Sequence, residues 1–311
     1  MASTHTDSKD PHSLDNQTSN ANPTTDEYFV APDQRENDYD RLNLQHEIWK
    51  MIMRGVTPIP EGVLDTVLGP EAVILDVGCG SGIWCSEIGQ KYPLAKVIGF
   101  DVAKCDPKDP PNNCSFIQGN LLDGLEEFYG QFDLVHCRAV IIHVEPAKQN
   151  WAVRELVKCL RPGGLVVLSD FDELFLNEHR TRLPAAQDND DSGKRVSWMA
   201  RLRCELFRQE DPVDSILRFK IRDALQDNPE IDQTTLDTAL YEVPVGWEGY
   251  NGEDGLLLGK MASLDFMDGL ERISEDVIEV WARNVTPELT GTGTRFIHRW
   301  HSTWARKTGS T

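Results

Sequence analysis

Short apolar runs alternate with helix-spaced apolar positions through the middle of the chain, between Val73 and Leu168. The runs predict strands at 73–77, 97–100, 115–118, 132–136 and 165–169. Between them, apolar residues recur at helical spacing, as at Val153, Leu156 and Val157. Strands that alternate with helices of this length are typical of βαβ units. The pattern therefore predicts an α/β fold with a mostly parallel sheet.

The flanks of this central region differ from it. Residues 1–38 are rich in Ser, Thr, Asn, Asp and Pro and predict a disordered tail, and residues 39–311 form the folded part. Within the folded part we distinguish an N-terminal helical region at 39–70, a core at 71–175 and a third region at 176–311. In that third region the pattern predicts helical residues at 198–225, a strand at 236–243, helices at 256–270 and 274–284, and a last strand at 295–304.

Composition narrows the class of protein. The chain of 311 residues carries 51 acidic and 31 basic side chains, a formal net charge of −20. Nucleic acid and anionic membranes bind clustered Lys and Arg, so neither is expected as a partner. No apolar run approaches the roughly 18 residues of a membrane span, and the N-terminus has no apolar signal-peptide core. Seven cysteines without a C-x-x-C pair indicate reduced thiols, and we expect a cytoplasmic protein.

A glycine-rich turn follows the first predicted strand. Asp76 lies in that strand, and Gly78, Gly80 and Gly82 occupy alternate positions before a helix. Glycine lets the backbone turn sharply and approach a ligand closely, and a helix N-terminus offers free N–H groups. A dinucleotide-binding fingerprint, G-x-G-x-x-G, would require glycine where Ile83 stands. The spacing therefore disfavours a nicotinamide-dependent oxidoreductase.

Polar residues follow the next strands. Asp101 ends the second strand, 19 residues after Gly82, where a carboxylate can accept both ribose hydroxyls of a bound nucleoside. Asn120 follows the third strand and could face an adenine amino edge. The fourth strand lies within 131–138, and Arg-Pro-Gly-Gly at 161–164 precedes the fifth.

In this order the segments resemble the motifs of class I S-adenosylmethionine-dependent methyltransferases. Further segments are similar to the fungal LaeA-like (TAM-domain) family, namely 40–46, 82–84, 97–101 and 243–247. The resemblance covers about 39–304 and is looser beyond Asp170. It implies a Rossmann-like fold, a seven-stranded mostly parallel sheet with helices on both faces, plus an N-terminal helix and a helical insertion or lid.

The resemblance also implies a set of site residues. Those expected to bind S-adenosylmethionine are Asp76, Gly78, Gly80, Gly82, Asp101, Val102, Asn120, Leu121, Cys137 and Arg41. For Arg41, pairing with the methionine carboxylate and an ordinary solvated helix face stay open. His143 is the candidate catalytic base or substrate-binding group, with a loop or helix-capping histidine as the alternative. His136 is interpreted as a core histidine, and no Cys/His spacing predicts a metal site.

The expected reaction is methyl transfer to an O, N or S atom of a small molecule in fungal secondary metabolism. The alternative is a LaeA-like regulatory protein that acts through protein partners, and the oligomeric state stays open. The helices at 198–225 and 256–270 are the expected lid and acceptor wall. Residues 229–279 hold 13 acids and two bases, which favours a neutral or cationic acceptor.

Overall fold

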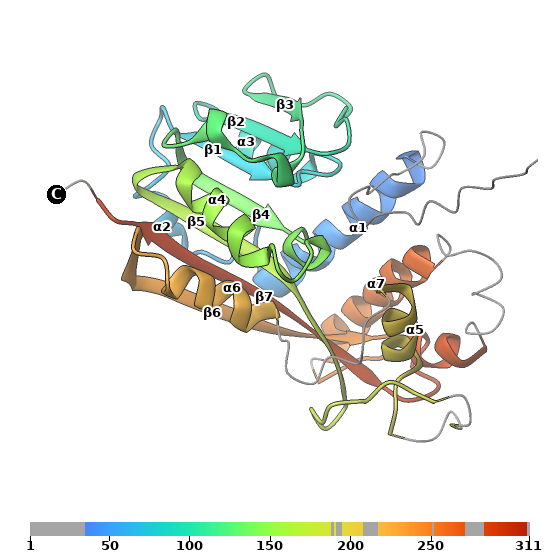
Figure 1. The fold of residues 1–311 in the computed structure, drawn as a ribbon. Helices are drawn as coiled ribbons and strands as arrows, with labels where there is room; N and C mark the ends of the chain where they lie inside the picture. Colours follow the sequence, from blue (N-terminus) through green and yellow to red (C-terminus); the bar gives the residue numbers. More distant parts are fainter. Residues whose placement is uncertain are drawn as a thin grey trace, which may run out of the picture.

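A single sheet organises the computed structural model, which describes residues 35–187, 190, 195–207, 217–250, 252–270 and 283–309. In this part of the chain the sheet has seven strands in the order β3-β2-β1-β4-β5-β7-β6. They are β1 (Val73–Val77), β2 (Lys96–Asp101), β3 (Cys114–Gln118), β4 (Phe132–Arg138), β5 (Leu160–Asn177), β6 (Ile231–Val245) and β7 (Phe296–Lys307). Strands β1 to β5 pair in parallel, and β7 runs antiparallel to β5 and β6. This arrangement confirms the predicted Rossmann-like α/β fold (Figure 1).

The central strands are apolar on both faces because helices cover both. On one face Ile74 of β1 belongs to the same buried cluster as Trp84 of α3 (Ile83–Lys91). On the other face Leu75 lies in a cluster with Leu156 of α4 (Gln149–Cys159). A strand buried on both faces shows a continuous apolar run rather than an alternation. This is why the apolar runs located these strands correctly.

The antiparallel half of the sheet extends beyond this core. Strands β5, β6 and β7 are 18, 15 and 12 residues long, and β5 and β7 pair from Leu165 through Asn177 with an irregularity after Phe171. Their far ends carry a second buried cluster together with α5 (Trp198–Phe207) and α7 (Gly252–Leu270). Figure 1 shows β7 running from the side of α5 and α7 to the parallel half of the sheet.

Helix α1 (Arg35–Met53) bridges the two halves. Ile48 and Trp49 on its buried face are fully enclosed, and the Trp49 ring lies 4.6 Å from the ring of Trp300 on β7. The helix contacts both α3 and α7. In Figure 1 it crosses the side of the molecule between the upper strands and α7. Its position covers the carboxyl ends of the parallel strands.

Several predicted boundaries differ from the observed ones. Helix α1 begins at Arg35 rather than near 39, and the rest of the predicted tail, 1–34, lies outside the described residues. The predicted helix at 198–225 is two helices, α5 and α6 (Leu217–Gln226). The predicted helix at 274–284 falls almost wholly on undescribed residues, and the helix seen nearby spans 283–289.

Strand β6 is longer than predicted, and its length has a physical reason. It begins at Ile231 instead of 236, and its early residues are polar. Backbone hydrogen bonds to β7 hold it as an edge strand, with a register shift between Asp232 and Asp237. An edge strand is defined by its ladder more than by apolar burial, so apolar patterning misses part of it.

Candidate active site

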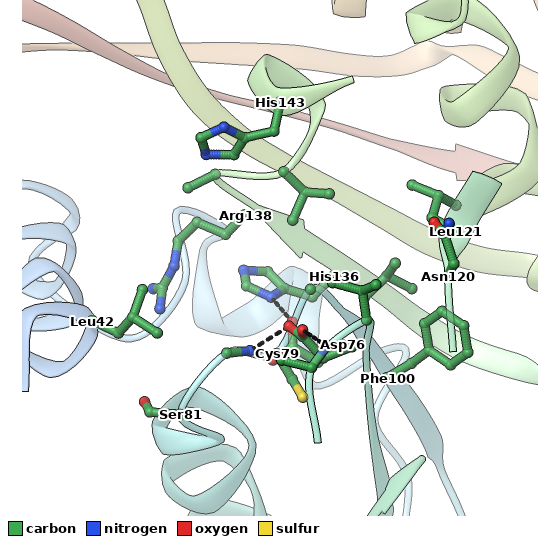
Figure 2. A pocket seen from close by; sticks show the side chains of 18 of the residues that line it. Leu42, Asp76, Cys79, Ser81, Phe100, Asn120, Leu121, His136, Arg138 and His143 are labelled. Carbon is green, nitrogen blue, oxygen red and sulfur yellow. Dashed lines mark hydrogen bonds and ion pairs between the residues drawn. The ribbon is translucent and has the colours of Figure 1, made fainter. Parts of the chain in front are cut away.

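A pocket of about 260 Å³ lies where β1, β2 and β4 end. Five segments form its walls, namely α1, the glycine-rich turn after β1, the loop after β2, the loop after β3, and the segment after β4. In open α/β sheets this carboxyl edge is where ligands bind. Figure 2 shows its lining side chains converging from these segments.

The glycine-rich turn forms one wall through backbone alone. Gly78 and Gly80 line the pocket with φ of 75° and 54°, a left-handed conformation that favours glycine. A Cβ on Gly78 would lie 2.1 Å from Cγ2 of Val140, a residue that follows β4. Gly82 also has a positive φ and caps α3, but a Cβ there would meet Phe116. Gly82 does not line the pocket, so its predicted role as a ligand contact is not supported by its placement.

Asp101 joins two walls of the pocket. One of its carboxylate oxygens accepts a hydrogen bond from the Gly80 N–H at 2.8 Å, and the other accepts one from the Ala103 N–H at 2.8 Å. These bonds fix the carboxylate against both the glycine turn and the loop after β2. A carboxylate oxygen has more than one lone pair, so each can accept a further hydrogen bond from a ligand hydroxyl.

The wall beside Asp101 is mainly apolar. Val102 is 42% exposed and lines the pocket together with Phe100 and Leu121. Asn120 also lines the pocket, and its side-chain oxygen accepts the Leu122 N–H at 2.9 Å. That bond caps the short 3-10 helix Leu121–Asp123 and fixes the amide. Apolar side chains around one fixed amide suit a flat heterocyclic base.

Strand β4 presents alternate side chains to the pocket. His136 and Arg138 line it, whereas Cys137 does not. Cys137 is 1% exposed and belongs to the cluster that packs against α4. Side chains alternate between the two faces of a strand, so a residue between two pocket-lining neighbours points away. The side chain of Cys137, which was expected to contact the cofactor, therefore points away from the pocket.

A buried polar group forms the base of the pocket. Asp76 Oδ1 accepts a hydrogen bond from His136 Nδ1 at 2.7 Å, and the Cys85 thiol donates to Asp76 Oδ2 at 3.3 Å. The His136 ring stacks on Trp84 with centroids 3.8 Å apart. Burial lowers the pKa of His136, although Asp76 opposes that shift. The predicted core histidine is thus buried and hydrogen-bonded, and it also lines the pocket.

Arg41 and His143 also line the pocket. Arg41 Nη1 lies 3.5 Å from Asp265 Oδ1 of α7, and Gln45 donates to the same carboxylate at 3.4 Å. His143 lines the pocket and is open to it. Desolvation of its ring by the protein groups around it and, secondarily, the Arg41 charge lower its pKa to about 4. Its imidazole is therefore neutral near pH 7 and can accept a proton.

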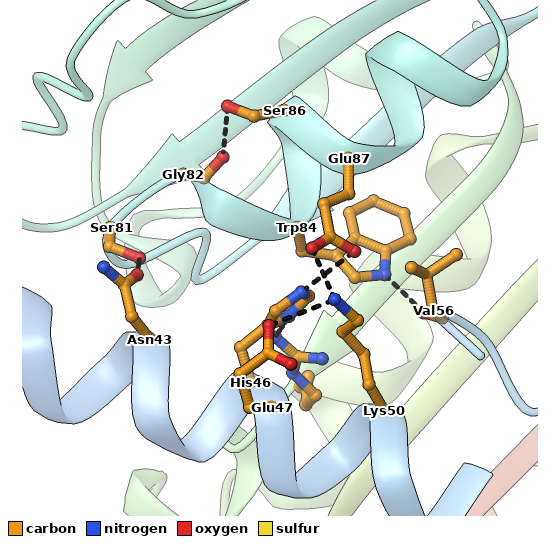
Figure 3. Close-up of polar contacts among 11 residues, drawn as sticks. Asn43, His46, Glu47, Lys50, Val56, Ser81, Gly82, Trp84, Ser86 and Glu87 are labelled. Atoms are coloured by element: carbon orange, nitrogen blue, oxygen red, sulfur yellow. Dashed lines mark hydrogen bonds and ion pairs between the residues drawn. The ribbon is translucent and has the colours of Figure 1, made fainter. Parts of the chain in front are cut away.

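A polar chain behind the pocket connects α1 with α3 (Figure 3). His46 Nε2 of α1 lies 3.3 Å from a carboxylate oxygen of Glu87 on α3, and Lys50 donates to Glu87 at 2.7 Å. Arg138 donates to His46 Nδ1 at 2.9 Å from the pocket side. Sequence reasoning did not single out Arg138. Its position two residues after His136 on one strand face was the available signal.

One group of potential metal ligands occurs among the residues that the structure describes. Ligand atoms of His46, Glu47 and Glu87 lie within 4.8 Å of one another. The Lys50 ammonium contacts both carboxylates, at 3.0 and 2.7 Å. It therefore already balances the charge at which a cation would bind. Separately, none of the described helices is both long and apolar enough to cross a membrane.

The fold and the pocket define a methyltransferase-like class of protein, and sequence comparison gives the family. The profile of a methyltransferase domain matches residues 55–211. The chain therefore belongs to this methyltransferase domain family. The seven-stranded, mostly parallel sheet that the resemblance implies is the sheet observed, with β7 antiparallel between β5 and β6.

Similar proteins come from fungi. The secondary metabolism regulator laeA of Aspergillus flavus is 35% identical over 230 residues, which cover 70% of this chain and 54% of that protein. Methyltransferase str3 of Strobilurus tenacellus is 28% identical over 161 residues, which cover 51% of this chain and 54% of that protein. The protein-methionine methyltransferase laeA of Emericella nidulans is 36% identical over 148 residues, which cover 44% of this chain and 34% of that protein. The chain spans about half the length of these curated relatives or less.

Among solved structures, phosphoethanolamine N-methyltransferase 2 of Haemonchus contortus in complex with S-adenosyl-L-methionine is 13% identical. The match has a TM-score of 0.47 and covers 90% of this chain and 61% of that chain.

Proposed function

We propose that this protein is an S-adenosylmethionine-dependent methyltransferase that methylates an O, N or S atom of a small molecule. The observation that carries the proposal is the fixed Asp101 carboxylate between Gly80 and Ala103 at the strand ends. The apolar residues beside it and the continuous path to His143 support it further. Membership of the methyltransferase domain family gives independent support.

The pocket residues fit this cofactor group by group. Asp101 would accept hydrogen bonds from the ribose hydroxyls, and Val102 and Leu121 would flank the adenine. Gly78 and Gly80 line the pocket with left-handed backbone that favours glycine. A Cβ at Gly78 would clash with Val140, which also lines the pocket. The match of a carboxylate, an apolar slot and a bare backbone favours a nucleoside with a polar extension.

S-adenosylmethionine supplies a methyl group already activated on a sulfonium sulfur. The protein then has to orient the acceptor and exclude water from the pocket. Phe171 and Val144 are apolar residues of the same pocket lining as His143. The neutral His143 would take the proton of a hydroxyl or ammonium acceptor, a step that a carboxylate or thiolate acceptor would not need.

Calorimetric titration with S-adenosylmethionine and S-adenosylhomocysteine tests the cofactor assignment. We expect binding by the wild type and a loss of about 10-fold or more for Asp101→Ala, because two charge-assisted hydrogen bonds are removed. Asp106→Asn is the matched control, since Asp106 lies on the same loop with an 81% exposed side chain. Wild-type protein that binds neither compound would refute the proposal, as would unchanged affinity in Asp101→Ala.

We further propose that the acceptor is a fungal secondary metabolite and that the protein acts in the cytoplasm. The names and sources of the similar proteins support the first part. Incubating the protein with labelled donor and small-molecule extracts, followed by a search for mass shifts of one methyl group, identifies acceptors. Absence of any labelled small molecule would contradict this reading.

A second candidate function is regulation through protein partners, which the names of several relatives favour. In that case labelled methyl groups would appear on protein, or partners would copurify without any methylated metabolite. The same labelling experiment, resolved into protein and small-molecule fractions, distinguishes the two candidates.

A further inference from the structure

Arg138 has an unusual position at the end of β4. It lines the pocket, and its Nη2 donates to His46 Nδ1 at 2.9 Å. Its Nη1 is buried and has no hydrogen-bond partner in the described part of the chain. A buried donor without a partner is costly, so native proteins seldom keep one without a use.

The charge of Arg138 has no directly paired carboxylate among the residues that the structure describes. Arg41 and Arg218, by contrast, lie within 3.5 Å of Asp265 and Asp172. The carboxylate of Asp76, also at the pocket base, is already bonded to His136 and Cys85. Burial lowers the pKa of Arg138 to about 10, which still leaves it charged near pH 7. A buried cation of this kind is stabilised by an anion that enters the pocket.

The neutral His46 ring accepts a hydrogen bond from the Arg138 guanidinium but carries no negative charge to balance it. Its Nδ1 accepts from Arg138, so the proton of the neutral ring lies on Nε2, which faces Glu87 at 3.3 Å. Burial and the charges of Arg138 and Lys50 lower the pKa of His46 to about 2. Lys50 in turn forms an ion pair with Glu87 at 2.7 Å, and Figure 3 marks this contact. These contacts orient Arg138 through Nη2 and leave Nη1 without a hydrogen-bond partner in the described part of the chain.

The position of Arg138 in the pocket indicates which part of a bound ligand it would contact. In Figure 2 Arg138 and Leu42 lie across the pocket from Asn120 and Leu121. Asn120 and Leu121 belong to the wall suited to a heterocyclic base. In an adenosyl amino acid, the carboxylate stands at the opposite end from the adenine.

We propose that Arg138 binds the carboxylate of the methionine portion of S-adenosylmethionine, with His46 as its positioning residue. This inference rests on the proposed function and assigns to Arg138 the role that the sequence suggested for Arg41. Arg41 is already paired with Asp265, whose negative charge would repel a second carboxylate. A planar guanidinium with a buried, unused nitrogen is suited to a carboxylate.

The test compares two ligands that differ only in this group, S-adenosylmethionine and decarboxylated S-adenosylmethionine. Affinities are measured by calorimetry for the wild type, Arg138→Met and Arg138→Lys. Arg138→Met should lose about 10- to 100-fold in affinity for the carboxylate-bearing ligand and less than about 3-fold for the other. Arg138→Lys keeps the charge but not the planar guanidinium. Its affinity for the carboxylate-bearing ligand should lie between those of the wild type and Arg138→Met. Arg41→Met is the control and should not discriminate between the ligands.

The outcomes separate this inference from the proposed function. Equal losses for both ligands in both Arg138 variants would show a structural role and overturn the inference, as would no loss for either. Selective loss in Arg41→Met with none in Arg138→Met would also overturn it. Binding of the decarboxylated ligand by a variant shows that its pocket has formed. If the wild type binds neither ligand, the proposed function itself fails.

Discussion

Asp76 and His136 are direct partners across the adjacent parallel strands β1 and β4, and their side chains meet at 2.7 Å. The carboxylate accepts the Nδ1 proton, so the neutral tautomer of His136 is defined by its partner. Trp84 stacks on the other side of the ring. This arrangement gives the pocket a rigid floor, and the predictions that follow concern the residues around it and the buried charges elsewhere in the fold.

Gly78→Ala should destabilise the protein and weaken donor binding by about 10-fold or more. The new Cβ would lie 2.1 Å from Val140 Cγ2, on a backbone with φ of 75°. Gly130→Ala is a matched control, because its φ is 70° but nothing lies within 4 Å of the added Cβ. The control should lose about 1–2 kcal/mol of unfolding free energy from backbone strain alone, and Gly78→Ala about 1–3 kcal/mol more. Urea unfolding and calorimetry measure both effects, and equal stability losses would refute the steric argument.

We expect protonation of His143 to set the acid limb of the pH–activity profile. A base must be deprotonated to work, and the pKa of His143 is lowered to about 4. For a hydroxyl or ammonium acceptor, activity limited by this group should therefore persist below pH 6.5 and fall near pH 4. His143→Gln should reduce kcat by about 10²–10⁴-fold while leaving donor affinity nearly unchanged. A variant with wild-type kcat across this pH range would remove His143 from the reaction.

Three buried histidines predict sensitivity to acid. Burial lowers the pKa of His46 to about 2, of His298 to about 4 and of His301 to about 3. Below about pH 6.5 the unfolded chain binds protons that the folded chain does not. The unfolding free energy therefore decreases as the pH is lowered. Each histidine contributes at most about 1.4 kcal/mol per pH unit. Urea unfolding between pH 7.5 and 5.5 should show this slope.

The variant His301→Phe isolates one of these histidines. Neither ring nitrogen of His301 has a hydrogen-bond partner among the described residues, so phenylalanine removes the titration without breaking such a bond. The pH slope of the unfolding free energy should become shallower by about 1 kcal/mol per unit. His179→Gln serves as the control, because the His179 side chain is 75% exposed. An unchanged slope in His301→Phe would contradict the assignment.

Glu288 should have the opposite pH dependence. It accepts hydrogen bonds from the backbone N–H groups of Trp198 and Met199 at the start of α5 and from the Ser197 hydroxyl. Burial nevertheless raises its pKa to about 7. Its folded-state affinity for a proton exceeds that of the unfolded chain, so this contribution to stability is lost as pH rises from 4.5 to 7. Relative to Glu288→Gln, the wild type should lose on the order of 3 kcal/mol over this range. Paired urea titrations measure the difference, and parallel pH curves would disprove it.

The parallel half of the sheet could be predicted because its strands are buried on both faces. Such strands produce apolar runs, and β1, β2 and β4 appear in the sequence close to their observed bounds. The polar start of β6 could not be predicted in this way, since the β7 ladder holds it. For the site, Asp101 and Asn120 were predictable because they follow strands at fixed spacing from the glycine-rich turn. The orientation of the Cys137 side chain could not be predicted, because a strand that is apolar on both faces gives no sign of which side chain faces the pocket.

By itself the amino-acid sequence determined the class of fold, the glycine-rich turn and the residues at the strand ends, because local spacing encodes these features. Only the tertiary structure decided which charges meet. Arg138 and His46 are 92 residues apart, and Arg41 and Asp265 are 224 apart. Which arginine receives a carboxylate and which remains without one depends on how α1 packs between α3 and α7. That packing is set by the buried surfaces of several distant segments together, and no local pattern in the chain records it.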